Sequence, residues 1–157
     1  MSAQPALPTL FLPPQRPLLP AEWRQGIVAL EAAMRALPGH VEGSGDHCPL
    51  RHGFAQGLCA REMFLPPGML VVGRIHKQSH LSFLMLGKLL VIDEFSGRQY
   101  REAPDWWVSE RGVKRGLYAL EPSALLCVFA TDCTDEDALE DELTVTTYEE
   151  LVIEEEP

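Results

Sequence analysis

The chain has 157 residues, a formal net charge of −10 and a hydrophobic content of 46%. A hydrophobic content of this size is ordinary for a globular protein and excludes wholesale disorder. The longest apolar runs fall short of the roughly 18–20 residues that span a bilayer, and the N-terminus lacks the basic and apolar regions of a signal peptide. We therefore expect one domain with extra terminal segments, located in the cytoplasm and not secreted by a signal peptide.

The negative charge is concentrated near the C-terminus. No Lys or Arg follows Arg115, and twelve of the 23 acidic residues lie between Asp132 and Glu156. Binding to nucleic acid depends on cations that displace phosphate counterions, so we expect no nucleic-acid partner, and no membrane partner either. Residues 132–157 are predicted to form a solvated, partly helical extension, with an interaction tail as the alternative. The four cysteines have no C-x-x-C spacing and are expected to be reduced thiols.

The N-terminal part is predicted to contain an arm and a helix. Residues 1–20 are rich in proline, which favours an extended arm, and its apolar residues indicate packing on its own domain or on a neighbouring subunit. Residues 21–38 form a predicted amphipathic helix that packs on the core, with coiled-coil dimerisation as the alternative. The apolar stripe of this helix recurs at helical period: Trp23, Ile27, Leu30, Met34 and Leu37.

The middle of the chain shows a loop followed by short strands. Residues 39–53 are predicted to form a loop because Gly and Pro recur there. Its histidines and Cys48 lack the second Cys/His pair of a zinc finger, which disfavours zinc. From residue 57 onward, short apolar segments alternate with turn signals, as in an antiparallel jelly roll or barrel. The predicted strands are 57–65, 69–76, 80–87, 88–95, 98–103, 105–109, 114–120 and 124–131. Two further helices are predicted at 134–142, capped by Thr134, and at 147–154.

Ionisable residues occur where the β-rich core is expected to form. At a period of two, Arg74 and His76 share one face at the end of the strand 69–76, and His80 opens the next strand. Two histidines this close across a bend are expected to converge on one point.

The spacing of these residues resembles the first motif of the cupin superfamily, in which two histidines and a glutamate precede a glycine. Arg74, His76 and His80 take the two histidine positions and the glutamate position, and Arg115 takes the histidine position of the second motif. The resemblance covers residues 54–131 and implies a mainly β protein with a single RmlC-like, cupin-type antiparallel jelly roll. The run Gly73–Lys77, with the Lys114-Arg115 pair, is most similar to small cupin-like proteins of tailed bacteriophages.

The resemblance leaves three interpretations of the site open. His76 and His80 are metal ligands in the first, for zinc, iron, nickel or copper. In the second, Arg74 and Arg115 bind an anion together with the histidines. In the third, all four residues form a buried polar network. Arginine repels a cation, so a degenerate site without a metal is favoured. The sequence indicates no activated nucleophile, whereas an acid–base role of His76 or His80 is chemically reasonable, so catalysis stays open.

The same resemblance implies a function and a set of partners. The leading expectation is a phage-type structural or interaction protein, in the host cytoplasm or in the virion. The alternatives are a metal-dependent enzyme that acts on a sugar or an oxidisable acid, and a non-catalytic small-molecule binding module. A homo-oligomer, most simply a dimer, is expected through the sheet surface and the N-terminal arm, with other virion proteins as further partners.

Overall fold

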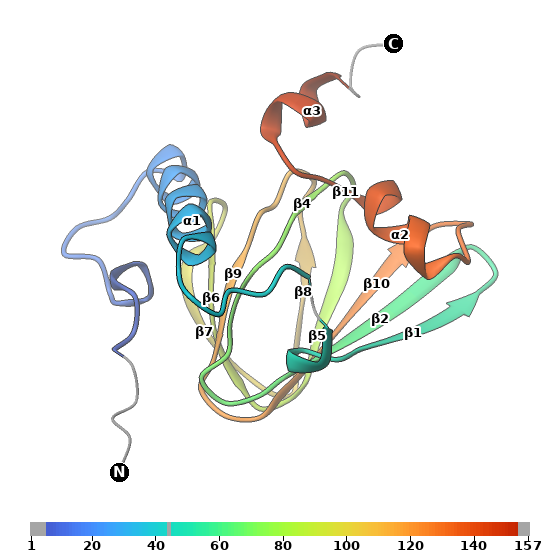
Figure 1. The fold of residues 1–157 in the computed structure, drawn as a ribbon, viewed down its shortest axis with the longest axis horizontal. Helices are drawn as coiled ribbons and strands as arrows, with labels where there is room; N and C mark the ends of the chain where they lie inside the picture. Colours follow the sequence, from blue (N-terminus) through green and yellow to red (C-terminus); the bar gives the residue numbers. More distant parts are fainter. Residues whose placement is uncertain (1–5, 44, 154–157) are drawn as a thin grey trace.

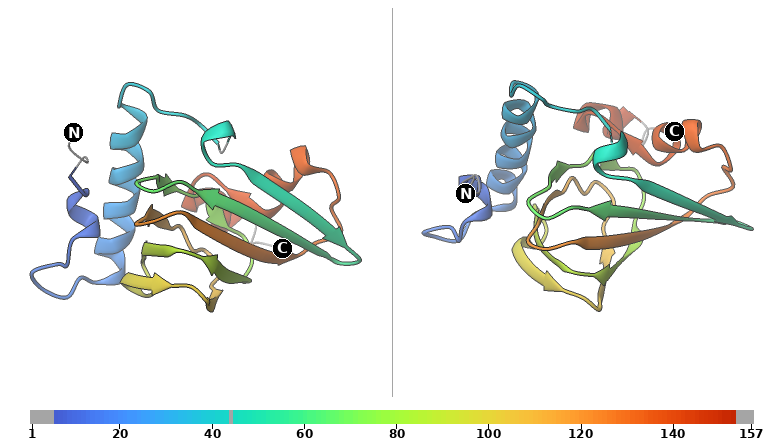
Figure 2. Two further views of the ribbon diagram at one scale, coloured as in Figure 1. Left: turned by 90° about the horizontal axis from the view of Figure 1, so that it is seen from below. Right: turned by 60° about the horizontal axis from the view of Figure 1, so that its bottom comes forward.

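The computed structural model describes residues 6–43 and 45–153 (Figure 1). Within them lie eleven strands, and helix α2 (Glu136–Leu143) lies between the last two (Figure 1 and Figure 2). The strands are β1 (Leu50–Ala55), β2 (Leu58–Leu65), β3 (Leu70–Val72), β4 (Ile75–His76), β5 (His80–Leu86), β6 (Lys88–Asp93), β7 (Gly97–Glu102), β8 (Asp105–Ser109), β9 (Gly116–Ala119), β10 (Ser123–Ala130) and β11 (Thr144–Val145).

The strands form two main antiparallel sheets. The five-stranded sheet has the order β1-β2-β10-β5-β8, and the four-stranded sheet has the order β3-β9-β6-β7. Strands β4 and β11 pair separately, with His76 opposite Thr144. The expected mainly β, cupin-type jelly roll with an N-terminal helix and a short helical extension is confirmed.

The strand expectations fail at two places. Residues 50–53 belong to β1, although a loop was expected there, because β1 pairs with β2 along its whole length and turns at Gln56-Gly57. The predicted strand 69–76 is two strands, β3 and β4, because the backbone leaves the sheet at Gly73-Arg74. The Gly73 N–H still donates to the Arg115 carbonyl at 3.0 Å. The chain between β3 and β4 therefore stays attached to the barrel, although the period-two alternation of its side chains is interrupted there.

An apolar core fills one part of the space between the two sheets. The inward side chains of the five-stranded sheet include Leu65, Leu84 and Leu125, and those of the four-stranded sheet include Leu89 and Val91. All five are at most 4% exposed, so this part of the barrel is closely packed.

A second apolar cluster covers the outer face of the four-stranded sheet. Helix α1 (Pro20–Arg35) lies beside that sheet and away from β1 (Figure 1). Its Trp23 and Ile27 pack with Phe11 of the arm against Ile92 and neighbouring residues. Phe11 belongs to the 3-10 helix η1 (Thr9–Phe11). Residues 6–20 of the arm thus pack, at least in part, on the chain's own sheet.

Polar contacts join this N-terminal layer to the barrel. The Arg98 guanidinium donates to the Phe11 carbonyl at 2.6 Å. The buried Lys114 ammonium lies 2.8 Å from the Glu31 carboxylate of α1 and 2.8 Å from the Gly73 carbonyl. Helix α1 is therefore held by both apolar and ionic contacts.

The C-terminal extension lies at one end of the barrel (Figure 1). Helix α2 (Glu136–Leu143) is capped by Asp135, and not by Thr134 as predicted, because the Asp135 carboxylate accepts the Asp137 N–H. Its Leu139 and Leu143 pack on Phe129 and Cys59. Helix α3 (Tyr148–Ile153) places Tyr148 under the Arg24 guanidinium, 3.9 Å from the ring centroid. Among the described residues, no helix is long and apolar enough to cross a membrane.

Candidate functional site in the barrel interior

The interior of the barrel is polar at the end away from the leucine core. The register of the five-stranded sheet aligns Arg61, Cys127, Ser82 and Trp107 in one inward row. The Ser82 hydroxyl lies 2.8 Å from the Ser109 hydroxyl and 3.6 Å from the Cys127 thiol. Burial raises the pKa of the Cys127 thiol, so this cysteine is a protonated packing residue and no activated nucleophile.

His76 and His80 meet at this polar end, as their spacing predicts. Their ring centroids lie 4.3 Å apart, and the Phe129 ring lies 5.7 Å from His76 and 4.6 Å from His80. The Nδ1 atom of His76 and both ring nitrogens of His80 are buried and make no hydrogen bond of normal geometry with the described residues. The hydrogen bonding of the pair is thus incomplete, and the nearest polar group that acts on His80 is the Gln78 backbone.

The surroundings keep both imidazoles neutral. Burial, reinforced by the charges of Arg115 and Arg61, lowers the pKa of His80 to about 3, and the Gln78 backbone opposes this in part. Burial also lowers the pKa of His76 well below its usual range, and His80 and the same two arginines act in the same direction. Burial disfavours the charged form, and nearby cations add to that effect.

Arg115 lies in the interior beside a cavity of about 220 Å³. It is 8% exposed, and its nearest carboxylate among the described residues is Asp93, at 3.5 Å from Nε. The geometry of this pair is poor enough that Nε makes no hydrogen bond. The Asp93 carboxylate instead accepts the N–H groups of Phe95 and Ser96 at 2.9 and 2.6 Å. Arg115 therefore keeps free donor capacity in a buried place.

Two further side chains shape the cavity. The Trp107 ring has the Arg101 guanidinium 4.1 Å from its centroid and the Arg115 guanidinium 5.9 Å from it. Arg101 pairs with Asp105 at 2.7 Å. Glu110 also lines the cavity and is exposed, which places one carboxylate at the solvent side and the buried guanidinium of Arg115 at the inner side.

The structure brings together three of the four residues that the sequence singles out. The His76 and His80 rings are in contact, and Arg115 is close enough for its charge to act on both imidazoles, although neither histidine lines the cavity beside Arg115. Arg74 lies elsewhere, because the break after β3 turns its side chain toward α2, where it donates to Asp141 at 3.0 Å. Four other interior residues carry no sequence signal of their own, because their proximity depends on strands far apart in the chain: Arg61, Asp93, Arg101 and Phe129.

The residues present do not fit a divalent metal centre. Within residues 6–43 and 45–153, no group of three or more His, Cys, Asp or Glu side chains is arranged to hold a metal ion. The two imidazoles stand alone with the guanidiniums of Arg61 and Arg115 close by, and guanidinium groups repel a cation.

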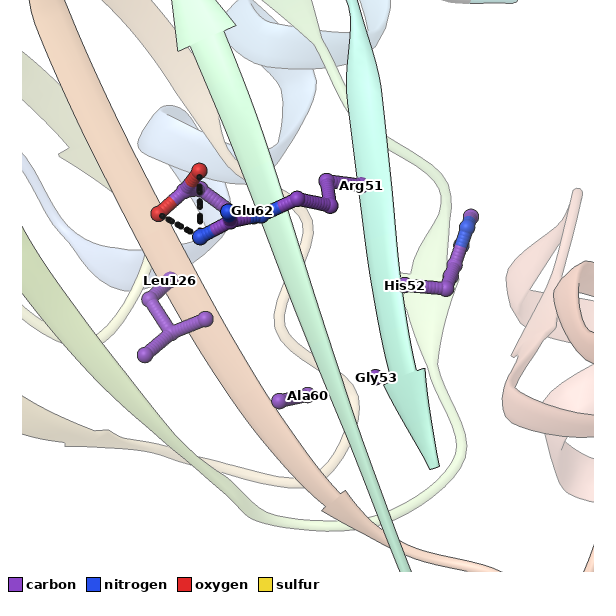
Figure 3. A pocket seen from close by; sticks show the side chains of 6 residues that line it. All are labelled: Arg51, His52, Gly53, Ala60, Glu62 and Leu126. Carbon is purple, nitrogen blue, oxygen red and sulfur yellow. Dashed lines mark hydrogen bonds and ion pairs between the residues drawn. The ribbon is translucent and has the colours of Figure 1, made fainter. Parts of the chain in front are cut away.

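A second hollow lies on the outer face of the five-stranded sheet (Figure 3). It measures about 320 Å³ and is lined by β1, β2 and β10. Gly53 and Ala60 form its floor, and the Arg51–Glu62 ion pair of 3.3 Å lies next to Leu126 at one side. Five of its six lining residues lie in the outward rows of these strands, and the sixth, His52, lies opposite Arg61 in the inward row. None of the six lines the cavity beside Arg115.

No protein-family model and no curated protein sequence matches the chain. Among solved structures, the chain is similar to KdgF from Halomonas sp., with a TM-score of 0.51 and 15% identity over 62% of this chain and 90% of that one. An RmlC-like cupin from Shewanella frigidimarina NCIMB 400 has a TM-score of 0.50 and 21% identity over 61% and 85%. A salicylate 1,2-dioxygenase from Pseudaminobacter salicylatoxidans has a TM-score of 0.50 and 15% identity over 69% and 32%.

At these identities the likeness shows the fold alone, which is that of the RmlC-like cupins. Structures with this fold include an enzyme as well as a cupin whose name states no activity. The resemblance to phage proteins gains no support from these comparisons.

Proposed function

We propose that this protein is a binding module that holds a small polar molecule with one carboxylate or phosphate group in the barrel interior. The observation that carries this proposal is the buried Arg115 guanidinium, which lines a cavity of about 220 Å³ and whose one ion-pair partner among the described residues is Asp93, at 3.5 Å from Nε. A buried guanidinium with incomplete hydrogen bonding is costly, and an anionic oxygen reduces that cost.

The neighbours of Arg115 support the same class of ligand. The Trp107 ring offers an apolar wall of the cavity, and the Arg101 guanidinium adds a second cation to its lining. Exposed Glu110 at the solvent side disfavours a second anionic group on the ligand. A monoanion with an uncharged polar body fits this arrangement.

The interior favours binding over catalysis. The described residues supply no three-ligand metal group, and the Cys127 thiol is held protonated by burial. The Ser82 and Ser109 hydroxyls bond to each other, so neither is paired with a base. A metal-dependent reaction on a sugar or an acid is therefore the weaker candidate.

Thermal unfolding with simple probes tests this proposal. Inorganic phosphate, acetate and benzoate are each titrated against the full chain, and at least one is expected to raise the melting temperature, because a ligand that binds only the folded state stabilises it. Arg115→Gln is expected to abolish the rise. Arg51→Gln, which removes an exposed guanidinium from the outer sheet face, is the matched control and keeps it.

Two results would overturn the proposal. One is the absence of any rise with all three probes; the other is a rise that persists in Arg115→Gln. If Arg115→Gln does not fold by circular dichroism, Trp107→Leu takes its place, with at least about a tenfold loss in affinity expected from the lost wall of the cavity.

A further inference from the structure

Helix α2 closes one end of the barrel over an apolar cluster. It lies beside the end of β10, away from α1 (Figure 1). Its Leu139 and Leu143, which are 1% and 3% exposed, pack on Phe129. The Phe129 ring also contacts the imidazole rings of His76 and His80. The helix therefore covers the ring on which the histidine pair packs.

Two neighbouring acidic side chains of α2 pair with arginines of the barrel. The Glu140 carboxylate accepts a hydrogen bond from Arg61 at 2.8 Å, and the Asp141 carboxylate accepts one from Arg74 at 3.0 Å. Arg61 belongs to the inward row of the five-stranded sheet, and its guanidinium lies 5.1 Å from the Phe129 ring centroid. Largely buried cations need anionic acceptors, so α2 supplies the anions that this end of the barrel requires.

The two partners in each ion pair differ in their exposure to water. The Arg61 and Arg74 side chains are 16% and 29% exposed, whereas those of Glu140 and Asp141 are 42% and 82% exposed. Water and dissolved anions therefore reach the carboxylate side of both pairs. An anion with two carboxylates can replace both acidic side chains at once, and the second contact then forms at a high effective concentration.

The chain on the two sides of α2 is attached to the barrel unequally. Residues 131–135, which connect β10 to α2, lie outside helices and strands. At the other end, the Lys77 N–H donates to the Leu143 carbonyl at 2.9 Å, and β11 pairs with β4 through Thr144 and His76. The C-terminal end of α2 is thus anchored through the backbone, and we expect the helix to open about that end.

We propose that α2 is an autoinhibitory lid. In the closed state its two carboxylates occupy the anion-binding positions at Arg61 and Arg74. A small molecule with two or three carboxylates displaces them and opens the barrel end over the histidine pair. No residue of α2 lines the cavity beside Arg115, so this inference is independent of the proposed function.

Thiol labelling of the full chain measures how often the lid opens. Cys59 is fully buried in the cluster under α2, whereas Cys48 is 4% exposed in the leucine core. Burial raises the pKa of both thiols, so each is expected to react with N-ethylmaleimide only when its surroundings open. Peptide mass spectrometry gives the two rates separately.

Glu140→Gln is expected to speed the labelling of Cys59 at least about fivefold and to leave the rate at Cys48 unchanged. Glu62→Gln is the matched control, because it also removes a carboxylate that pairs with an arginine, on the outer face of the sheet. This control is expected to change neither rate. If Glu140→Gln does not fold by circular dichroism, Asp141→Asn takes its place, with an expected gain of about twofold or more.

Citrate tests the class of ligand. At about 20 mM, it is expected to speed the labelling of Cys59 in the wild type about threefold more than sodium chloride of equal ionic strength does. Three results contradict the lid. They are an unchanged Cys59 rate in Glu140→Gln, a Cys48 rate that rises together with it, which indicates opening of the whole barrel, and an effect of citrate no larger than that of chloride.

Discussion

Two glycines in hairpin turns show how strongly the surroundings of a glycine determine the cost of replacing it. Gly87, between β5 and β6, has φ +88°, and a Cβ built there lies 2.3 Å from the Pro122 carbonyl oxygen. Gly57, between β1 and β2, has φ +75°, and its Cβ meets no atom within 4 Å. Both positions strain any other residue, but only Gly87 adds a collision with backbone.

We predict that Gly87→Ala lowers the free energy of unfolding by about 2–4 kcal/mol more than Gly57→Ala does, since Gly57→Ala suffers only the positive-φ strain of about 1 kcal/mol. Urea unfolding followed by circular dichroism measures both. Equal losses would show that the Pro122 backbone moves away freely.

At the residue scale, the sequence predicts which residues lie close together better than it predicts where each side chain points. It singles out His76, His80 and Arg115, which lie together in the interior. Arg74 is misplaced by period-two reasoning, because the bend at Gly73 interrupts the strand.

At the scale of elements, the attachment of α1 to the barrel depends on a buried ion pair. Lys114 is 3% exposed, and Glu31 lies 2.8 Å from its ammonium group. Glu31 has a second partner, since Arg35 approaches it at 3.2 Å. The two partners are therefore unequal. Loss of the Glu31 carboxylate leaves the buried Lys114 ammonium with the Gly73 carbonyl but with no opposite charge. Loss of Lys114 leaves a carboxylate that is still paired with Arg35.

Accordingly, Glu31→Gln is predicted to cost about 3 kcal/mol of unfolding free energy, and Lys114→Met about 1 kcal/mol. Arg16→Gln, in an exposed pair with Glu22, is the control and should cost less than either of the other two variants, because water screens an exposed ion pair. Chemical unfolding of the three variants checks the order. A larger loss for Lys114→Met than for Glu31→Gln would contradict it.

The elements themselves follow closely from sequence where the pattern is strong. The apolar stripe predicts α1, and turn signals separate most strands correctly. β1 is missed because Gly53 is a breaker in isolation, and only its pairing with Ala60 of β2 makes it a strand residue. The polar end of the interior is not predicted as a unit. Asp93 and Arg101 lie on β6 and β7, and Arg115 directly precedes β9, and a single sequence does not reveal that these three strands are neighbours.

At the scale of the whole molecule, the buried histidines make the fold sensitive to acid. The pKa of His80 is lowered to about 3 by burial, chiefly, and by Arg115, and that of His76 is also lowered, against about 6.5 in the unfolded chain. Below about pH 6.5 the unfolded state therefore binds more protons than the folded state, and stability falls as pH decreases toward the folded pKa values.

Between pH 7 and pH 5, where most carboxylates stay ionised, the two histidines are predicted to lower the free energy of unfolding by about 2–4 kcal/mol. His80→Leu is expected to remove about half of this pH dependence, and His47→Gln, at an exposed position, none of it. Urea unfolding at the two pH values provides the measurement. An unchanged pH dependence in His80→Leu would show that the histidines are hydrated or paired in solution.

The covering of the four-stranded sheet by α1 and the arm has a consequence for which part of the chain counts as the folded unit. Phe11, Trp23 and Ile27 pack on the outer face of this sheet, and the Arg98 guanidinium donates to the Phe11 carbonyl at 2.6 Å. A barrel without this N-terminal segment would expose the buried side chains of Leu90 and Ile92 to water. The segment is therefore a structural part of the barrel and no appendage to it.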